Sequence, residues 1–168
     1  TPYKESWKKF HDILYRHTIG FQLDAYLGDI KFYKPAVFAA RYTFGIFDYL
    51  SVGAEFSGFY DNGKLNTKVS RTTLDTRYGL LCHVKYPYLK YLHPFFEVSV
   101  YYGHVKEENK GTYIGIKKSD YFSGYAAPGI SINMYRKRIS FDFFYKFSPR
   151  KIINNKYHVL TWRMNVNF

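Results

Sequence analysis

The sequence predicts an eight-stranded antiparallel transmembrane β-barrel, on three observations. Aromatic residues make up 22% of the 168 positions, including 19 Tyr and 16 Phe, more than one small soluble core would bury. The mean hydropathy is −0.36, and no apolar run reaches the roughly 18 residues that a transmembrane helix needs. Segments of about ten residues alternate between apolar and polar side chains, as barrel strands do. The abundance of aromatic residues also excludes a disordered chain.

Eight segments carry this alternation with a period of two, the pattern of half-buried strands. An even number of such strands suits an up-and-down barrel. Pro128 lies within the sixth segment, and because proline removes a backbone donor we expect a bulge or a local break in pairing there. The expected strands are residues 18–27, 38–46, 50–57, 77–85, 96–103, 125–133, 139–148 and 158–168.

The two faces of these strands differ in charge, and this difference predicts which face lines the lumen. An Arg or Lys on the lipid face near the midplane costs about 2–4 kcal/mol, so the charged face must point inward. Eight strands enclose only enough space for side chains. We therefore expect an ion-paired network that fills the lumen, with a gated ion or proton path as the alternative. The predicted network consists of Asp24, Arg41, Glu55, Arg77, Glu97, Asp142, Lys146 and Arg163.

The connections between the strands alternate in length. Residues 47–49 and 135–138 are short links, and 86–94 is a longer link punctuated by two prolines. The opposite links are longer and rich in Lys, Asn and Gly, which predicts periplasmic turns at one end and extracellular loops at the other. These expected loops are residues 28–36, 61–72, 106–120 and 149–156.

Residues 1–16 differ from the rest of the chain. Trp7, Phe10 and either Ile13 or Leu14 recur at helical spacing, which predicts an interfacial amphipathic helix ahead of a barrel at 17–168. An extended tail is the alternative. The chain begins at Thr1, so we expect a processed N-terminus. A single cysteine, Cys82, excludes a disulfide scaffold, and the histidines lack metal-site spacing, so neither a metal nor a cofactor is expected.

The C-terminal segment YHVLTWRMNVNF alternates and ends on phenylalanine, and it resembles the last strand of Gram-negative outer-membrane barrels. Strand count and loop asymmetry are similar to the small OmpA and OmpX class, and the Tyr-, Phe-, Lys- and Asn-rich composition resembles barrels of Bacteroidota. The resemblance implies an integral outer-membrane protein with a periplasmic N-terminus. It also implies an outward-facing signal for the barrel assembly machinery, formed by Trp162, Met164, Val166 and Phe168.

The net charge of +12 is compatible with nucleic acid or with anionic lipid. Nucleic-acid binding leaves the uniformly apolar strand face unexplained, so we expect no nucleic-acid partner. Basic residues of the expected loops would instead contact the phosphates of lipopolysaccharide in the outer leaflet. The predicted contact residues are Lys64, Lys68, Arg71, Lys117, Lys118, Arg150 and Lys151.

For function, the sequence favours a non-enzymatic barrel over an enzyme. It would serve as an accessory or structural subunit of an outer-membrane complex or as an envelope interaction protein, in contact with membrane lipid and other outer-membrane proteins. The alternative is a lipid A modifying enzyme. Lys146 and Ser148 have the spacing of the His-x-Ser pair of eight-stranded deacylases, but the histidine is missing. An acyltransferase set would need to be assembled from His17, Asp61 or Asp120, and Ser119 or Ser123.

Overall fold

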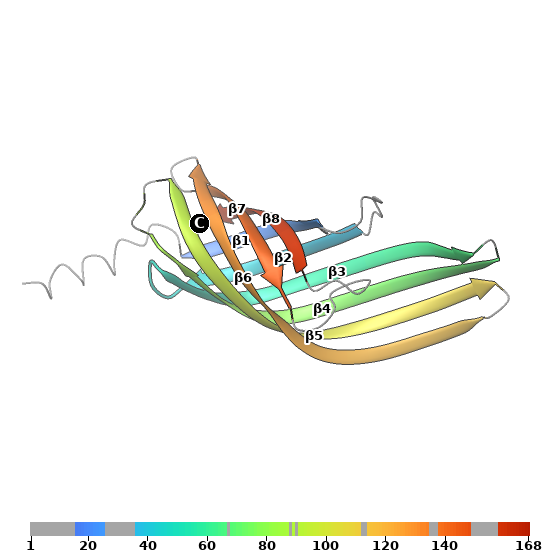
Figure 1. The fold of residues 1–168 in the computed structure, drawn as a ribbon. Coiled ribbons are helices and arrows are strands. Elements are labelled where there is room, and N and C mark those ends of the chain that lie inside the picture. The colour runs from blue at the N-terminus through green and yellow to red at the C-terminus, as the bar shows by residue number, and fades with distance from the viewer. Residues whose placement is uncertain are drawn as a thin grey trace, which may run out of the picture.

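The protein forms a closed antiparallel barrel in which each strand pairs with its sequence neighbours and β8 pairs with β1 (Figure 1). The computed structural model describes residues 16–25, 36–66, 68–87, 89, 91–111, 114–134, 138–148 and 158–168. The predicted segment at 1–16 therefore lies outside the described residues, except for Arg16. The strands are β1 (His17–Ala25), β2 (Ala36–Gly45), β3 (Leu50–Asn66), β4 (Val69–Lys85), β5 (Leu92–Gly111), β6 (Gly115–Met134), β7 (Ile139–Phe147) and β8 (His158–Asn167).

The predicted fold class, strand number and neighbour order are confirmed, whereas two predicted loops are wrong. Residues 61–72 and 106–120 belong almost entirely to β3–β6, which are 17 to 20 residues long, while the other four strands have 9 or 10. These stretches carry polar side chains on both faces, so they lack the hydrophobic alternation by which a strand is recognised. Backbone pairing does not depend on that alternation, and the ladders continue through them.

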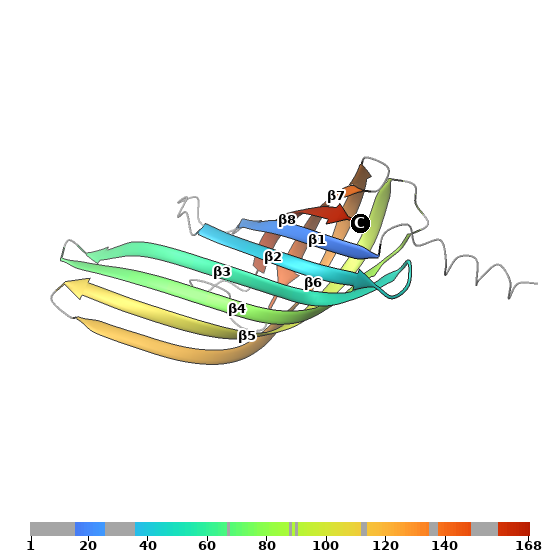
Figure 2. The same ribbon diagram turned by 180° about the vertical axis from the view of Figure 1, so that it is seen from behind.

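The long strands divide the molecule into a barrel and a projecting sheet (Figures 1 and 2). We define the projecting sheet as residues 61–66, 69–76, 104–111 and 115–120. Within the described part of the chain, β3 from Asp61 to Asn66 pairs only with β4, and β6 from Gly115 to Tyr125 pairs only with β5. The opposite end, with the short links 46–49 and 86–91, is called the turn end below.

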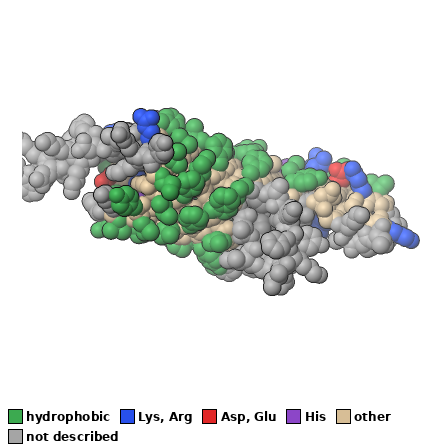
Figure 3. All heavy atoms as spheres, turned by 90° about the horizontal axis from the view of Figure 1, so that it is seen from above, with side chains coloured by type: hydrophobic (Ala, Val, Ile, Leu, Met, Phe, Trp, Pro, Cys, Tyr) green, Lys and Arg blue, Asp and Glu red, His purple; other side chains and the backbone are tan. Residues whose placement is uncertain are grey.

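Side chains alternate between the barrel interior and its outer surface. Phe144 and Ala127 are buried in the interior, whereas Leu80 and Phe122 expose 68% and 71% of their surface on the outside. On the face seen in Figure 3, hydrophobic side chains cover much of the outer wall, and charged ones gather at the far end of the projecting sheet. An apolar exterior of this extent is stable in lipid and unfavourable in water. No helix in the described part of the chain is long and apolar enough to span a membrane.

Two local features follow from the sequence. The pairing between β6 and β7 is interrupted between Gly129 and Ala126 without a change of register, so the break predicted at Pro128 is confirmed. The barrel closes where His17 and Phe168 exchange two backbone hydrogen bonds of 3.0 and 2.9 Å. These two residues place the beginning of β1 and the end of β8 together at the turn end.

Candidate functional site

A buried ion-pair network crosses the middle of the barrel. Arg163 places Nη2 at 2.9 Å from Glu97 Oε2 and 2.8 Å from Asp142 Oδ2. Arg41 contacts Glu97 through Nη1, and its Nη2 lies 3.6 Å from Asp142 Oδ2. These four side chains come from β2, β5, β7 and β8 and are each at most 4% exposed. The two arginines and the two carboxylates pair opposite charges, and charges buried in a low-dielectric interior must be paired in this way.

Three further side chains add hydrogen bonds to the two carboxylates. His83 Nδ1 lies 2.9 Å from Glu97 Oε2, and Tyr125 Oη lies 2.9 Å from Glu97 Oε1. Asn165 Nδ2 donates to Asp142 Oδ2 at 2.7 Å. His83 was not among the predicted interior residues, although its inward position on β4 follows from the same alternation as that of Arg77. Full hydrogen bonding of buried acids makes such a network rigid.

A second interior cluster lies where the barrel meets the projecting sheet. Arg77 donates from Nη2 to Asp75 Oδ2 at 2.8 Å, and Tyr121 Oη lies 2.7 and 2.8 Å from the two Asp75 oxygens. Arg77 also stacks over the Tyr101 ring, 5.2 Å from its centroid. Asp75 was missed because the expected strand began at residue 77. Arg77 is therefore held by a partner two positions away on its own strand.

The remaining predicted interior residues have different surroundings. Glu55 is buried, with Oε2 at 3.1 Å from Tyr125 Oη. Lys146 is buried with its ammonium group 4.7 Å from the centroid of the Tyr125 ring, a cation–π distance. Asp24 lies in β1 opposite Thr161, but its side chain is outside the described part of the structure.

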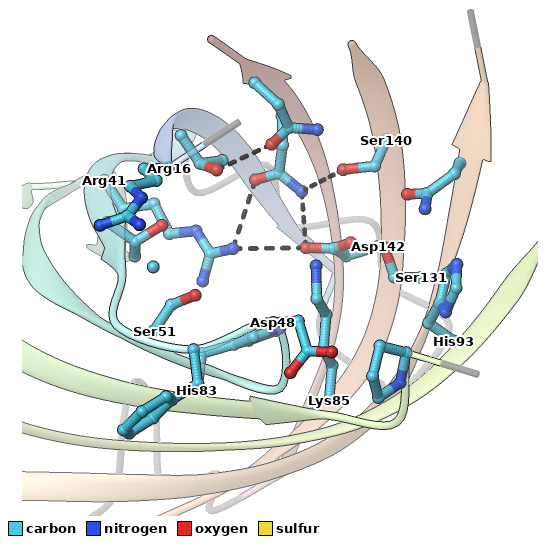
Figure 4. A pocket seen from close by; sticks show the side chains of 18 residues that line it. Arg16, Arg41, Asp48, Ser51, His83, Lys85, His93, Ser131, Ser140 and Asp142 are labelled. Atoms are coloured by element: carbon cyan, nitrogen blue, oxygen red, sulfur yellow. Dashed lines mark hydrogen bonds and ion pairs between the residues drawn. The ribbon is translucent and has the colours of Figure 1, made fainter. Parts of the chain in front are cut away.

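A polar cavity of about 170 Å³ lies between the network and the turn end (Figure 4). Arg41 and Asp142 of the network line it, together with Lys85, Ser51 and His93. His93 is buried, with Nδ1 at 3.1 Å from the Tyr86 carbonyl oxygen. The cavity therefore separates the network from the links at the turn end.

The predicted lipopolysaccharide-contacting cations do not share one loop surface. Arg71, Lys117 and Lys118 lie in strands, and Arg71 forms an ion pair with Glu107. Lys117 is opposite Glu107 on the face that continues the barrel interior, whereas Lys118 is on the outward face opposite Lys106. Lys68 is exposed in the β3–β4 turn. The side chain of Lys64 and all of Arg150 and Lys151 lie outside the described part.

Alternation explains this separation, because successive residues of one strand point to opposite faces. Adjacent Lys117 and Lys118 cannot both face the membrane once they belong to a strand. Lys106 was not among the predicted contact residues, and only the register shows that it lies directly across from Lys118.

The residues considered for catalysis are dispersed. His17 is at the turn end beside Phe168, whereas Asp120 is in the projecting sheet opposite His104. Ser119 and Ser123 share the inward parity of buried Tyr121, so they lie on the other face of β6 from Asp120. The acyltransferase set is not assembled.

The deacylase-like pair is also unsuited to attack on a lipid. Lys146 and Ser148 are both buried in the interior, and the Ser148 hydroxyl donates to the Gly124 carbonyl oxygen at 2.7 Å. The described residues contain no group of three or more His, Cys, Asp or Glu side chains placed to hold a metal.

An exposed His–Asp pair does occur on the outward face. His104 Nδ1 contacts Asp120 Oδ1 across β5 and β6. This hydrogen bond, with a second one from Tyr102, lowers the pKa of the Asp120 carboxyl. The pair lies just beyond the apolar part of both strands.

The C-terminal strand presents its predicted signal residues to the outside. Trp162, Met164, Val166 and Phe168 alternate with buried neighbours and are between 41% and 54% exposed. The Phe168 ring stacks on His17, with 5.7 Å between the ring centroids.

No protein-family model and no curated protein sequence matches the chain. Solved structures match its fold. The N-terminal β-barrel domain of Pseudomonas aeruginosa OprF has 6% sequence identity and a TM-score of 0.66, covering 90% of this chain and 96% of that domain. Neisserial surface protein A has 12% identity and a TM-score of 0.63, covering 92% and 96% of the two chains.

Ail, the attachment invasion locus protein of Yersinia pestis, is similar at 15% identity with a TM-score of 0.55, covering 90% of this chain and 95% of Ail. Ail has also been crystallised with the heparin analogue sucrose octasulfate. At these identities the likeness concerns the fold. The chain therefore has the fold of the small eight-stranded outer-membrane β-barrels, which agrees with its apolar exterior and charged interior.

Proposed function

We propose that this protein is a non-enzymatic outer-membrane barrel that acts by interaction through its projecting sheet. The observation that supports this most directly is the extension of β3–β6 well beyond the other four strands. In the proposed orientation the turn end and the N-terminus are periplasmic, and the projecting sheet stands outside the cell. The barrel then serves as an anchor that presents the sheet.

The interior supports an anchoring role over a transport role. The network of Arg41, Glu97, Asp142 and Arg163 joins strands from opposite sides of the barrel. An eight-stranded barrel has room for such side chains and little more. We expect no stable conductance from the folded protein in planar-bilayer recordings, and a stable open level in the wild type would contradict the sealed interior.

The exposed edge of β6 favours a protein partner. Among the described residues, Gly115–Ser123 pairs with a strand on one side only, so the other side offers backbone donors and acceptors to an added strand. A partner with an exposed strand would extend the sheet there, either as an outer-membrane complex or as an external ligand. The protein would then be an accessory subunit or an envelope interaction protein.

A pull-down from native membranes in mild detergent tests this proposal. The matched variant shortens both hairpins at register pairs, replacing 61–73 and 107–117 by two-residue turns that join Tyr60 to Leu74 and Lys106 to Lys118. We expect a stoichiometric partner with the full-length protein and much weaker capture by the shortened one, in which the free edge of β6 begins only at Lys118. Recovery of only a lone monomer, or equal capture by both proteins, would contradict the interaction role.

The enzyme alternative has one observation in its favour, the His104–Asp120 pair at the edge of the apolar wall. An oriented histidine is a part that acyl-transfer enzymes use, although the candidate serines lie on the opposite face. Incubation with lipid A followed by mass analysis tests it. Acyl release or transfer that disappears in His104→Ala would replace our proposal with the enzymatic one.

The C-terminal strand supports recognition by the barrel assembly machinery during biogenesis. The proposal predicts slower assembly when the terminal ring is removed. Phe168→Ala should lower the fraction of protein that reaches the outer membrane, whereas refolding of the purified variant in detergent should be little changed. Equal loss in both measurements would assign Phe168 a purely structural role.

A further inference from the structure

An apolar groove of about 750 Å³ runs across the outer wall of the barrel from β1 to β6. Ala40 and Ala54 contribute only methyl groups to it, while larger rings such as Tyr42, Phe56 and Phe122 border it. A hollow on a lipid-facing wall must be filled by hydrocarbon, because water there would face apolar side chains alone. The groove is therefore suited to the acyl chain of a membrane lipid.

The strand register places two further layers directly beyond this groove. An aromatic row of Phe56, Tyr78, Tyr102 and Phe122 crosses β3–β6 at the projecting end of the groove. Aromatic rows of this kind mark the boundary between hydrocarbon and headgroups. Two positions further along the strands lie His104 and Asp120, and two positions beyond these lie Lys106 and Lys118.

Lys106 and Lys118 are directly opposite one another on the outward face. Like charges in this position repel, since the Cβ atoms of facing residues are only about 4.5–5.5 Å apart. The nearby acids on this face have other partners, because Asp120 hydrogen-bonds to His104 and Glu108 lies 3.9 Å from Lys110. Neither lysine has an ion-pair partner within the described part of the chain. An external anion between them would relieve the repulsion.

We propose that Lys106 and Lys118 bind the phosphate of a lipopolysaccharide molecule whose acyl chain lies in the adjoining groove. Tyr102 and Lys106 are about 13 Å apart along the strand, and a lysine side chain can extend back toward the boundary. A phosphate monoester carries about −1.5 to −2 charges at neutral pH, which matches two lysines better than the single charge of a phospholipid diester. The inference rests on the proposed orientation, in which this end faces the outer leaflet.

The decisive comparison uses two charge-matched double variants. Lys106→Gln/Lys118→Gln removes the proposed site. Lys110→Gln/Lys117→Gln removes the same charge, but Lys110 lies further from the groove and Lys117 is on the opposite face. Each protein is folded into phosphatidylcholine nanodiscs containing a small fraction of bisphosphorylated lipid A, and bound lipid is counted by native mass spectrometry. Heat-dependent gel mobility confirms that each variant is folded.

We expect lipid A retention by the Lys106/Lys118 variant to fall about tenfold to thirtyfold, with less than a threefold change in the control variant. Phosphatidylglycerol at the same fraction should be retained less well than lipid A by the wild type. Equal losses of lipid A retention in the two variants would mean that overall charge, and not these two lysines, determines retention, and this would overturn the site. Equal retention of the two lipids would overturn the assignment to lipopolysaccharide.

Three further variants separate the groove from the lysines and this inference from the proposed function. Ala54→Phe fills the groove and should lower lipid A retention, while Ala54→Ser should leave it nearly unchanged; retention that is equal in both would remove the groove from the site. The hairpin-shortened protein keeps Lys106 and Lys118, so it should retain lipid A while it captures much less of the protein partner. Loss of both activities in that protein would overturn the separate lipid site.

Discussion

The interior of the barrel and the face of the projecting sheet that continues it are built from the same strands, yet they use charge differently. Inside the barrel, Glu97 is completely enclosed and contacts two arginines, a histidine and a tyrosine. In the projecting sheet, Arg71 and Glu107 form a simple pair whose side chains are 42% and 26% exposed. Enclosure by β1, β2, β7 and β8 makes the difference, because it removes the water that would otherwise solvate each charge.

The largest expected effect comes from breaking the enclosed network. Glu97→Gln keeps the shape of the side chain but leaves Arg41 and Arg163 with too little negative charge. Removing one partner of a buried pair costs about 3–5 kcal/mol, so the free energy of unfolding in urea-treated vesicles should fall by that amount. A loss below about 1 kcal/mol would show that water enters the interior and that the network is not sealed.

Steric packing provides a second comparison between the two regions. A Cβ at Gly103 would lie 2.2 Å from Cζ of Tyr121, whereas a Cβ at Gly63 would meet nothing within 4 Å. Gly103→Ala should therefore reduce the free energy of unfolding by about 1–3 kcal/mol, with Gly63→Ala close to neutral. Equal unfolding midpoints for the two variants would contradict tight packing around Tyr121.

The exposed ion pair should contribute little. Glu107→Gln removes the partner of Arg71, but water solvates the remaining guanidinium, so we expect a loss of at most about 1 kcal/mol in the free energy of unfolding. The same urea titration measures it beside Glu97→Gln. A loss as large as that of Glu97→Gln would mean that the projecting sheet is enclosed in the folded protein.

The smallest effect concerns the titration of Asp120. Its pKa lies below the ordinary value of 3.8 because His104 and Tyr102 hydrogen-bond to the carboxylate. The stabilising contribution is therefore present above the ordinary pKa and is lost as the pH falls through the lowered one. Carboxyl ¹³C NMR in micelles should show a pKa below 3.8 in the wild type and a higher value in His104→Ala. An unchanged pKa in His104→Ala would show that His104 does not lower the pKa of Asp120.

Much of the barrel followed from periodicity, and the errors have a common origin. Alternation identified all eight strands and the inward side of residues such as Arg41 and Arg163, because lipid and lumen impose opposite polarities. It failed for 61–72 and 106–120, where water contacts both faces and no polarity difference is required. Asp75 is buried, and it was missed because it lies just outside the segment that alternation defined.

Which side chains contact one another inside the barrel was less predictable than which side chains point inward. The sequence places Arg77 and Lys146 on the charged face, but it does not indicate that Arg77 binds Asp75 or that Lys146 lies over the Tyr125 ring. Such contacts depend on strand stagger and barrel closure, which bring residues far apart in the chain into one layer.

The sequence by itself determined a barrel of eight alternating strands with an apolar face and a charged face. The pleat of each strand sets locally which face each residue occupies. Only the tertiary structure decided how far β3–β6 extend and which side chains meet. For example, only the structure shows that Lys106 and Lys118 lie opposite one another. The register between two strands is a property of their pairing and is encoded in neither strand alone.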